Sequence, residues 1–241
     1  MDIIGHRGAS YAAPENTLAS FKLAWAEGAD GIEGDFYLCK DGHIVCIHDK
    51  NTKRVAKQNL SVTQSTLAEL RTLDVGSWKD PRFAEERIPT LEEVIATIPA
   101  GKKLFIEIKD DERMVPHLQQ VLETTGVKPE QIRIIAFSLD VIRSCKAQLP
   151  EIKASWLVGK KQLIEVSLSG VLQTAKGVDF EGIGLEQGDH INADLVKAIH
   201  DAGIELHTWT GNSGADARRY RSLGLKSVTT DKPGYILGEL K

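Results

Sequence analysis

The nine residues DGIEGDFYL, at positions 30–38, decide how the chain folds. The segment is short and rich in apolar residues, as expected of a buried β-strand, yet Glu33 and Asp35 interrupt it. Because side chains alternate between the two faces of a strand, both carboxylates lie on one face, about 7 Å apart at about 3.3 Å per residue. A buried strand that carries two like charges needs a compensating partner.

Seven other short apolar runs alternate with stretches of helical pattern along the chain. The runs lie at residues 3–6, 102–109, 132–137, 153–158, 182–186, 204–210 and 226–230, and the helical stretches at 15–27, 114–125, 141–148, 193–202 and 215–223. Strands that alternate with helices indicate an α/β fold with a parallel sheet. Eight strands in about 250 residues are typical of a TIM (β/α)8 barrel, and this chain has 241 residues.

One segment departs from this alternation. Residues 51–89 carry leucines at helical spacing over residues 67–73, followed by a tract rich in glycine, proline and charge. Thr90 and Glu93 then fit a capping box, so a helix is expected to begin there and lead into the third strand. We therefore predict a single barrel domain over residues 1–241, with residues 51–89 as a small subdomain inserted after the second strand.

The composition restricts the class of protein. With 41% hydrophobic residues the chain can build a sizeable core, and 30 Lys and Arg against 34 Asp and Glu give a formal net charge of −4. That balance gives no electrostatic reason to bind nucleic acid, so an anionic ligand must be held locally. No apolar run approaches the roughly 18 residues of a membrane span. We expect no stable membrane insertion and a cytoplasmic protein, and we leave the oligomeric state open, a homo-oligomer included.

A hairpin is expected directly after the strand that decides the fold. Asp41 and Gly42 stand between two apolar-rich runs, which is a strong signal for a two-residue turn. If those two residues form the turn, Asp35 falls opposite His48, with Cβ atoms about 5 Å apart. The hairpin would then deliver His48 beside the carboxylates, and a one-residue slip would undo this register. Asp49 either orients His48 or caps the loop.

Further polar residues end the predicted strands, where a barrel builds its active face. His6 and Arg7 close the first strand, and Glu107 and Lys109 share one face at the end of the third. Together with the two carboxylates of the second strand, Glu107 would complete a set of oxygen ligands that suits a hard divalent cation, Mg²⁺ or Ca²⁺.

Taken together, several segments resemble the glycerophosphodiester phosphodiesterase family. They are HRGAS at 6–10, APENT at 13–17, GADGIEGD at 28–35, RIPTLEE at 87–93, EIK at 107–109, WT at 209–210 and TTDKP at 229–233, with His48 and Asp49 after the hairpin. These segments span nearly the whole chain, and their order and spacing are highly specific. The resemblance implies a barrel with a small insertion after the second strand, in agreement with the strand pattern.

The resemblance also implies an acid/base pair, a metal site and a phosphate-binding pair. The matching residues are His6 and His48 for acid and base, Glu33, Asp35 and Glu107 for the metal, and Arg7 and Lys109 for phosphate or substrate. Gly34 stands where relatives usually carry an apolar residue, and Ile47 before the histidine is a second departure, but neither removes a functional group. Trp209 ends the seventh strand and is expected to line the glycerol pocket.

The activity that the resemblance implies is metal-dependent hydrolysis of glycerophosphodiesters, which are small-molecule substrates, to glycerol 3-phosphate and an alcohol. It would belong to lipid and glycerol metabolism. Three carboxylates, a dication, Arg7 and Lys109 leave one positive charge, which a phosphodiester anion neutralises. Two histidines can divide proton removal and proton supply. Attack by the glycerol C2 hydroxyl would give a cyclic phosphate that water then opens, and direct attack by water is the other route.

Two other functions share these features. A carbon-carbon lyase or isomerase could use the same metal on the same barrel, because the fold does not determine the function. A non-catalytic phosphodiester-binding module is the third alternative. The histidine pair favours phosphoryl chemistry over the lyase, and the binding module would need a missing ligand or histidine, whereas none is missing.

Overall fold

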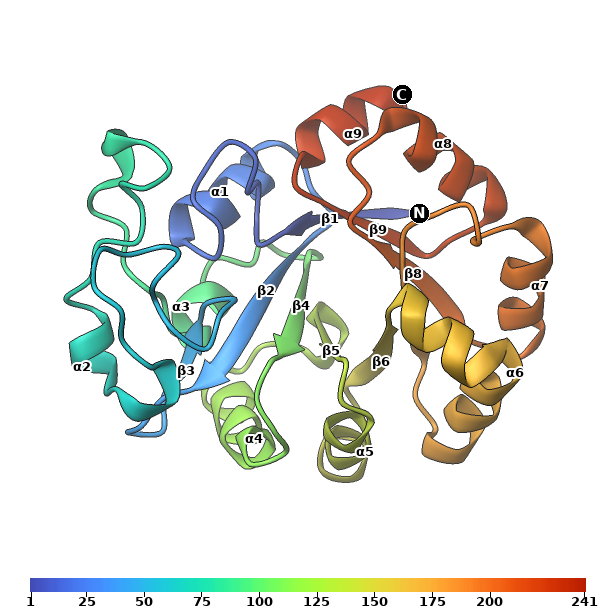
Figure 1. Cartoon of the computed structure of the whole chain (residues 1–241), viewed down its shortest axis with the longest axis horizontal. Helices are drawn as coiled ribbons and strands as arrows, with labels where there is room; N and C mark the ends of the chain where they lie inside the picture. Colours follow the sequence, from blue (N-terminus) through green and yellow to red (C-terminus); the bar gives the residue numbers. More distant parts are fainter.

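Eight parallel strands close into a barrel in the computed structural model, which describes all residues from 1 to 241. The first strand pairs with both the second and the last, and this double pairing closes the ring (Figure 1). The strands are β1 (Asp2–His6), β2 (Gly31–Leu38), β4 (Lys103–Ile108), β5 (Ile132–Ala136), β6 (Lys153–Val158), β7 (Gly182–Glu186), β8 (Glu205–Trp209) and β9 (Ser227–Thr230). The predicted TIM barrel is confirmed, with each of the eight runs forming a strand.

Helices surround the barrel and cover the outer faces of its strands (Figure 1). They are α1 (Leu18–Ala26), α3 (Leu91–Ile95), α4 (Met114–Thr125), α5 (Leu139–Gln148), α6 (Lys160–Val178), α7 (Ala193–Asp201), α8 (Gly214–Leu223) and α9 (Pro233–Glu239). A 3₁₀ turn, η3 (Pro129–Gln131), precedes β5. None of these helices combines the length and the apolar character that crossing a bilayer requires.

The sequence pattern did not predict α6 or α9. In α6 the backbone of Ser167 leaves the helical region, with φ 64° and ψ 158°, so the helix consists of two short pieces. Ile164 is 75% exposed, and Val171 and Ala175 are the buried residues of the helix. A kinked helix with so narrow a buried stripe lacks the regular period on which the prediction depends.

The insertion after the second strand packs on its own small apolar cluster. It contains η1 (Val62–Gln64), α2 (Leu67–Leu70) and η2 (Pro81–Phe83), and lies outside the barrel beside α1 and the antiparallel strand β3 (Ile44–Cys46) (Figure 1). The cluster joins hairpin residues to insertion residues: Tyr37, Cys39, Val45, Ile47, Val55, Val62, Leu70, Leu73, Val75 and Ile88. The expected capping box at Thr90 and Glu93 is confirmed. This packing is consistent with a small inserted subdomain, which stays a prediction.

The predicted register of the hairpin is wrong by one residue. Phe36 pairs with Cys46, so Ile47, and not His48, falls opposite Asp35, and the Ile47 N–H donates to the Asp35 carbonyl. The turn has three residues and ends on Gly42, whose φ of +84° lies in the left-handed region, as in a type I turn followed by a bulge. His48 follows β3 outside the ladder, so the register does not determine where its side chain lies.

The barrel interior is apolar in its middle layer and polar toward the amino ends of the strands. Ile4, Phe105, Ile135 and Leu157 pack together in the middle. Trp209 packs against them. Two residues before Ile135, Leu157 and Trp209, on the same strand faces, lie Arg133, Ser155 and His207, and the Arg133 guanidinium donates to Ser155 Oγ at 2.7 Å. His207 is 5% exposed and hydrogen bonded to Ser227 at 2.7 Å.

Buried His207 should make stability depend on pH. Burial, together with Arg133, lowers the pKa of His207 to about 4, whereas it is about 6.5 in an unfolded chain. The folded state then binds fewer protons than the unfolded state between these values, so stability falls as pH falls through this window. We expect wild type to lose about 2 kcal/mol more than His207→Gln between pH 7 and about pH 4.5, measured by urea unfolding. Equal losses in both proteins would contradict this account.

Candidate active site

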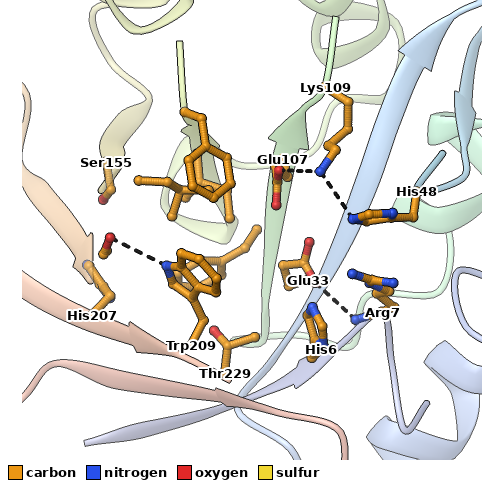
Figure 2. Close-up of a pocket in the computed structure, with 15 residues that line it drawn as sticks. His6, Arg7, Glu33, His48, Glu107, Lys109, Ser155, His207, Trp209 and Thr229 are labelled. Carbon is orange, nitrogen blue, oxygen red and sulfur yellow. Dashed lines mark hydrogen bonds and ion pairs between the residues drawn. The ribbon is translucent and has the colours of Figure 1, made fainter. Parts of the chain in front are cut away.

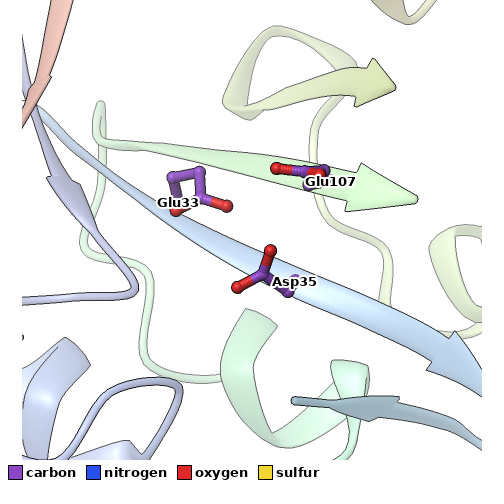
Figure 3. A group of neighbouring side chains, drawn as sticks. All are labelled: Glu33, Asp35 and Glu107. Atoms are coloured by element: carbon purple, nitrogen blue, oxygen red, sulfur yellow. The ribbon is translucent and has the colours of Figure 1, made fainter. Parts of the chain in front are cut away.

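Three carboxylates converge at the carboxyl end of the barrel. Asp35 on β2 is the register partner of Glu107 on β4, and Glu33 lies two residues earlier on the same face of β2. Figure 3 shows the three side chains turned toward one another across the two strands, with ligand oxygens that all lie within 4.8 Å. Glu33 and Asp35 are 2% and 1% exposed. The predicted sharing of one face is confirmed, and Gly34 does not disturb it.

The buried carboxylates are not fully compensated by the protein. Burial and the neighbouring Asp35 raise the pKa of Glu33 to about 8, and Glu33 Oε1 has no hydrogen-bond partner. Burial and Asp35 likewise raise the pKa of Glu107. Burial also raises the pKa of Asp35, but Arg7, Lys109 and His48 outweigh it, so the value is lowered. An unpaired oxygen inside an all-oxygen donor set fits a hard divalent cation.

Two cations flank the carboxylates. Arg7 directs Nε to Asp35 at 3.2 Å, and its backbone N–H donates to Glu33 at 3.0 Å. Lys109 donates to Glu107 at 2.9 Å and lies 3.3 Å from Nε2 of His48. Figure 2 shows Arg7, Lys109 and both histidines on one side of a single pocket. The cavity has a volume of about 150 Å³.

The loop after β1 shapes this side of the pocket. Arg7 and Gly8 both have positive φ, and a Cβ on Gly8 would lie 2.3 Å from Ser20 Oγ, so only glycine fits there. Asn16, also at positive φ, donates to Asp35 Oδ2 at 2.8 Å and accepts from the Asp35 N–H. Thr17 caps α1, its side chain accepting from the Ser20 N–H. The contact from Asn16 to Asp35 was not predicted.

His6 is held by a carboxylate that sequence reasoning missed. Its Nδ1 lies 2.6 Å from Asp231 Oδ1, and Ser10 and Asn212 donate to the same carboxylate at 3.0 and 2.6 Å. Burial raises the pKa of Asp231, but the hydrogen bond from His6 outweighs it and lowers the value to about 2. Burial lowers the pKa of His6, but Asp231 and Glu33 outweigh it, so the value is raised. The signal was a carboxylate directly after the last strand, inside the TTDKP segment.

His48 is held in the same way by its neighbour in sequence. Its Nδ1 lies 2.7 Å from Asp49 Oδ1, so Asp49 orients His48, the first of the two alternatives for that residue. Burial lowers the pKa of His48, and the charges of Arg7 and Lys109 add to this effect. Because a carboxylate accepts the Nδ1 proton of each imidazole, the Nε2 atom of each is the one left to exchange a proton, and that of His48 lies within reach of Lys109 Nζ.

The far side of the pocket is mostly apolar. Phe105, Ile135, Phe137, Leu157 and Trp209 line it, with Ser155, His207 and Thr229 beside them (Figure 2), and the rings of Phe137 and Trp209 lie edge to face at 5.4 Å. Trp209 thus lines this pocket, and its contact with glycerol stays a prediction. The structure brings every predicted site residue to one cavity or its acidic floor: His6, Arg7, Glu33, Asp35, His48, Glu107, Lys109 and Trp209. What they do chemically is a separate question.

One end of this TIM barrel gathers three carboxylates, two histidines that carboxylates hold, and an arginine with a lysine. These are the groups that phosphodiester cleavage needs. Comparison with known proteins leads to the same class of enzyme. The chain belongs to the glycerophosphoryl diester phosphodiesterase family, whose sequence model matches residues 6–235. It is therefore a phosphoric diester hydrolase, and the alternatives of a lyase or isomerase and of a binding module are set aside.

Relatives match along almost the whole chain. A glycerophosphodiester phosphodiesterase from Caldanaerobacter subterraneus subsp. tengcongensis is 34% identical, with 98% of this chain and 96% of the relative covered. One from Bacillus subtilis is 29% identical, over 95% of this chain and 83% of the relative. The structure of a phosphodiesterase from Oleispira antarctica, in complex with its product sn-glycerol-3-phosphate, superposes with a TM-score of 0.91 at 30% identity, covering 100% and 96% of the two chains.

Proposed function

We propose that this enzyme hydrolyses glycerophosphodiesters to glycerol 3-phosphate and an alcohol, using a divalent metal ion and two histidines. The observation that carries the proposal is the unpaired Oε1 of Glu33 within three buried carboxylates, beside two imidazoles whose Nδ1 atoms are already held. The product named for the Oleispira antarctica relative, sn-glycerol-3-phosphate, supports the choice of substrate.

Glu33, Asp35 and Glu107 are the residues that would hold the metal, Mg²⁺ or Ca²⁺. When bound, such an ion would supply Lewis-acid stabilisation of the charge that develops on the phosphate. Arg7 would donate a planar fork to phosphate oxygens, and Lys109 would add a compact charge. The apolar wall that includes Trp209 would pack against the carbon atoms of the glycerol.

The two histidines would divide the proton transfers. The pKa of His48 is lowered and that of His6 is raised, so His48 favours the neutral form and His6 the protonated form. We propose that Nε2 of His48 takes the proton of the glycerol C2 hydroxyl while Nε2 of His6 gives a proton to the leaving alcohol. The products of this step are a cyclic phosphate and the free alcohol. Water then opens the cyclic phosphate with the two roles reversed.

Removing the metal should remove the activity. We expect loss of turnover in excess chelator and recovery with Mg²⁺ or Ca²⁺. Without the ion, the three carboxylates repel one another and the charge that develops on the phosphate is not stabilised. Glu33→Gln should abolish calorimetric metal binding and turnover. It should also raise the melting temperature of the metal-free protein, because folding no longer has to raise the pKa of a buried carboxyl to about 8. Asp41→Ala is the control, since Asp41 only holds the hairpin turn through Cys39 and Leu67. Full activity in excess chelator would contradict the metal assignment.

Replacing either histidine should slow turnover without unfolding the protein. We expect His6→Ala and His48→Ala each to lose roughly 10²- to 10⁴-fold in kcat, the usual range for one acid or base. A bell-shaped dependence of kcat/KM on pH should accompany this in wild type, since the two groups must start in opposite protonation states. Asp231→Asn should also lower kcat, whereas His117→Ala should match wild type. Near-normal turnover of His48→Ala would refute its role.

A substrate without the C2 hydroxyl separates the two possible nucleophiles. A 2-deoxy glycerophosphodiester keeps the phosphate for Arg7 and Lys109, so it should bind and inhibit competitively. Intramolecular attack by a well-placed group can contribute about 7 to 11 kcal/mol, so the analogue should react at least about 10³-fold more slowly. Turnover within tenfold of the parent compound, with no cyclic phosphate trapped early, would instead indicate direct attack by water.

A further inference from the structure

Arg54 is an insertion residue that joins two loops of the active site. It follows β3 outside the barrel, and its side chain is 42% exposed. Its guanidinium makes three hydrogen bonds to two carboxylates: NH1 and NH2 donate to Glu15 at 2.6 and 2.9 Å, and Nε donates to Asp49 at 2.8 Å. The pair with Glu15 is a bidentate fork, which sets direction as well as distance.

Each of these carboxylates also holds one residue of the proposed catalytic machinery. Glu15 Oε1 accepts from NH1 of Arg7 at 2.8 Å, and Asp49 Oδ1 accepts from Nδ1 of His48 at 2.7 Å. Arg54 therefore stands at the centre of two short chains of contacts. One chain reaches the phosphate-binding side chain, and the other reaches the proposed general base.

We propose that Arg54 is a positioning residue that holds Arg7 and His48 together in their working orientations. This inference rests on the proposed roles of those two residues. The charges alternate along the path from Asp49 through Arg54, Glu15 and Arg7 to Asp35, and Asp49 accepts from His48 at its end.

Loss of Arg54 would free both orienting carboxylates. Asp49 has no donor other than His48 and Arg54, and Glu15 has none other than Arg7 and Arg54. Without the guanidinium each carboxylate can rotate, and the group it orients moves with it. A displacement of about 1 Å at a reacting group can cost about 10²-fold in rate.

Positioning must be separated from stability. The pair of Arg54 with Asp49 is partly exposed on both sides and contributes little to the free energy of unfolding, but Glu15 is only 13% exposed, so loss of Arg54 also lowers stability. Another arginine of the same insertion provides the surface case: Arg71 pairs with Glu93, is 38% exposed and lies away from the pocket. If both arginines were only surface ion pairs, replacing either would have the same small effect.

The test compares Arg54→Ala and Arg54→Lys with Arg71→Ala. We expect Arg54→Ala to lower kcat and raise KM, with a combined loss in kcat/KM of about 10- to 10²-fold, while Arg71→Ala stays within twofold of wild type, with each variant assayed below its melting temperature. Glu15→Gln should mainly raise KM and Asp49→Asn mainly lower kcat, since each breaks one chain. Arg54→Lys should recover only part of the activity that Arg54→Ala loses, because lysine lacks the planar fork of arginine. Added guanidinium ion should restore activity to Arg54→Ala and leave the activity of Arg71→Ala unchanged.

Two readouts do not depend on turnover. Nitrogen NMR of the His48 ring should show the Nδ1-protonated tautomer in wild type and a mixture of tautomers in Arg54→Ala. Calorimetry should show weaker binding of glycerol 3-phosphate to Arg54→Ala than to wild type or Arg71→Ala. If Arg54→Ala changes neither the tautomer of His48 nor the affinity for glycerol 3-phosphate, the positioning role of Arg54 is wrong, whether or not the proposed reaction is right. If wild type is active and the kcat/KM of Arg54→Ala stays within twofold of it, the positioning role of Arg54 is wrong while the proposed function stands.

Discussion

Three carboxylates buried on two adjacent strands are the constraint on which the rest of the site depends. The β2–β4 register brings Asp35 beside Glu107, and Glu33 lies on the same face because side chains alternate along β2. Like charges this close and this buried are unfavourable. The protein answers with Arg7, Lys109 and Asn16, all of which contact Asp35, and leaves one oxygen of Glu33 unpaired. Lys109 also donates to Glu107 and the Arg7 N–H to Glu33, but two raised carboxyl pKa values and one unpaired oxygen remain, which a cation held by all three carboxylates would compensate.

The same charges give the two histidines different environments. His6 lies next to Glu33 and Asp231, which favour its protonated form. His48 lies next to Arg7 and Lys109, which favour its neutral form. Two chemically identical groups can therefore favour opposite states, because burial, Arg7 and Lys109 outweigh Asp35 and Asp49 at His48, whereas Asp231 and Glu33 outweigh burial and Arg7 at His6. The acidic cluster and its cations thus account for the asymmetry that acid/base chemistry requires.

The strands and the groups on them could be predicted from the sequence, because alternation along a strand is a local rule. That rule placed Glu33 and Asp35 on one face and matched Glu107 with Lys109. The hairpin register failed because a three-residue turn ending on Gly42 replaced the expected two-residue turn. Helix α6 was missed because the break at Ser167 interrupts its period.

Two of the residues that orient the site, Asp231 and Arg54, could not be predicted, because their partners are distant in sequence. Asp231 reaches His6 across 225 positions, and Arg54 reaches Glu15 across 39. These orienting groups belong to loops, whereas the carboxylates that must keep a constant spacing belong to strands. His48 illustrates why this division matters: the predicted register was wrong, yet its side chain still lies in the pocket. Its position comes from Asp49, from Arg54 and from the apolar packing of Ile47 with the insertion, so contacts beyond the strand, and not the ladder itself, determine where the imidazole points.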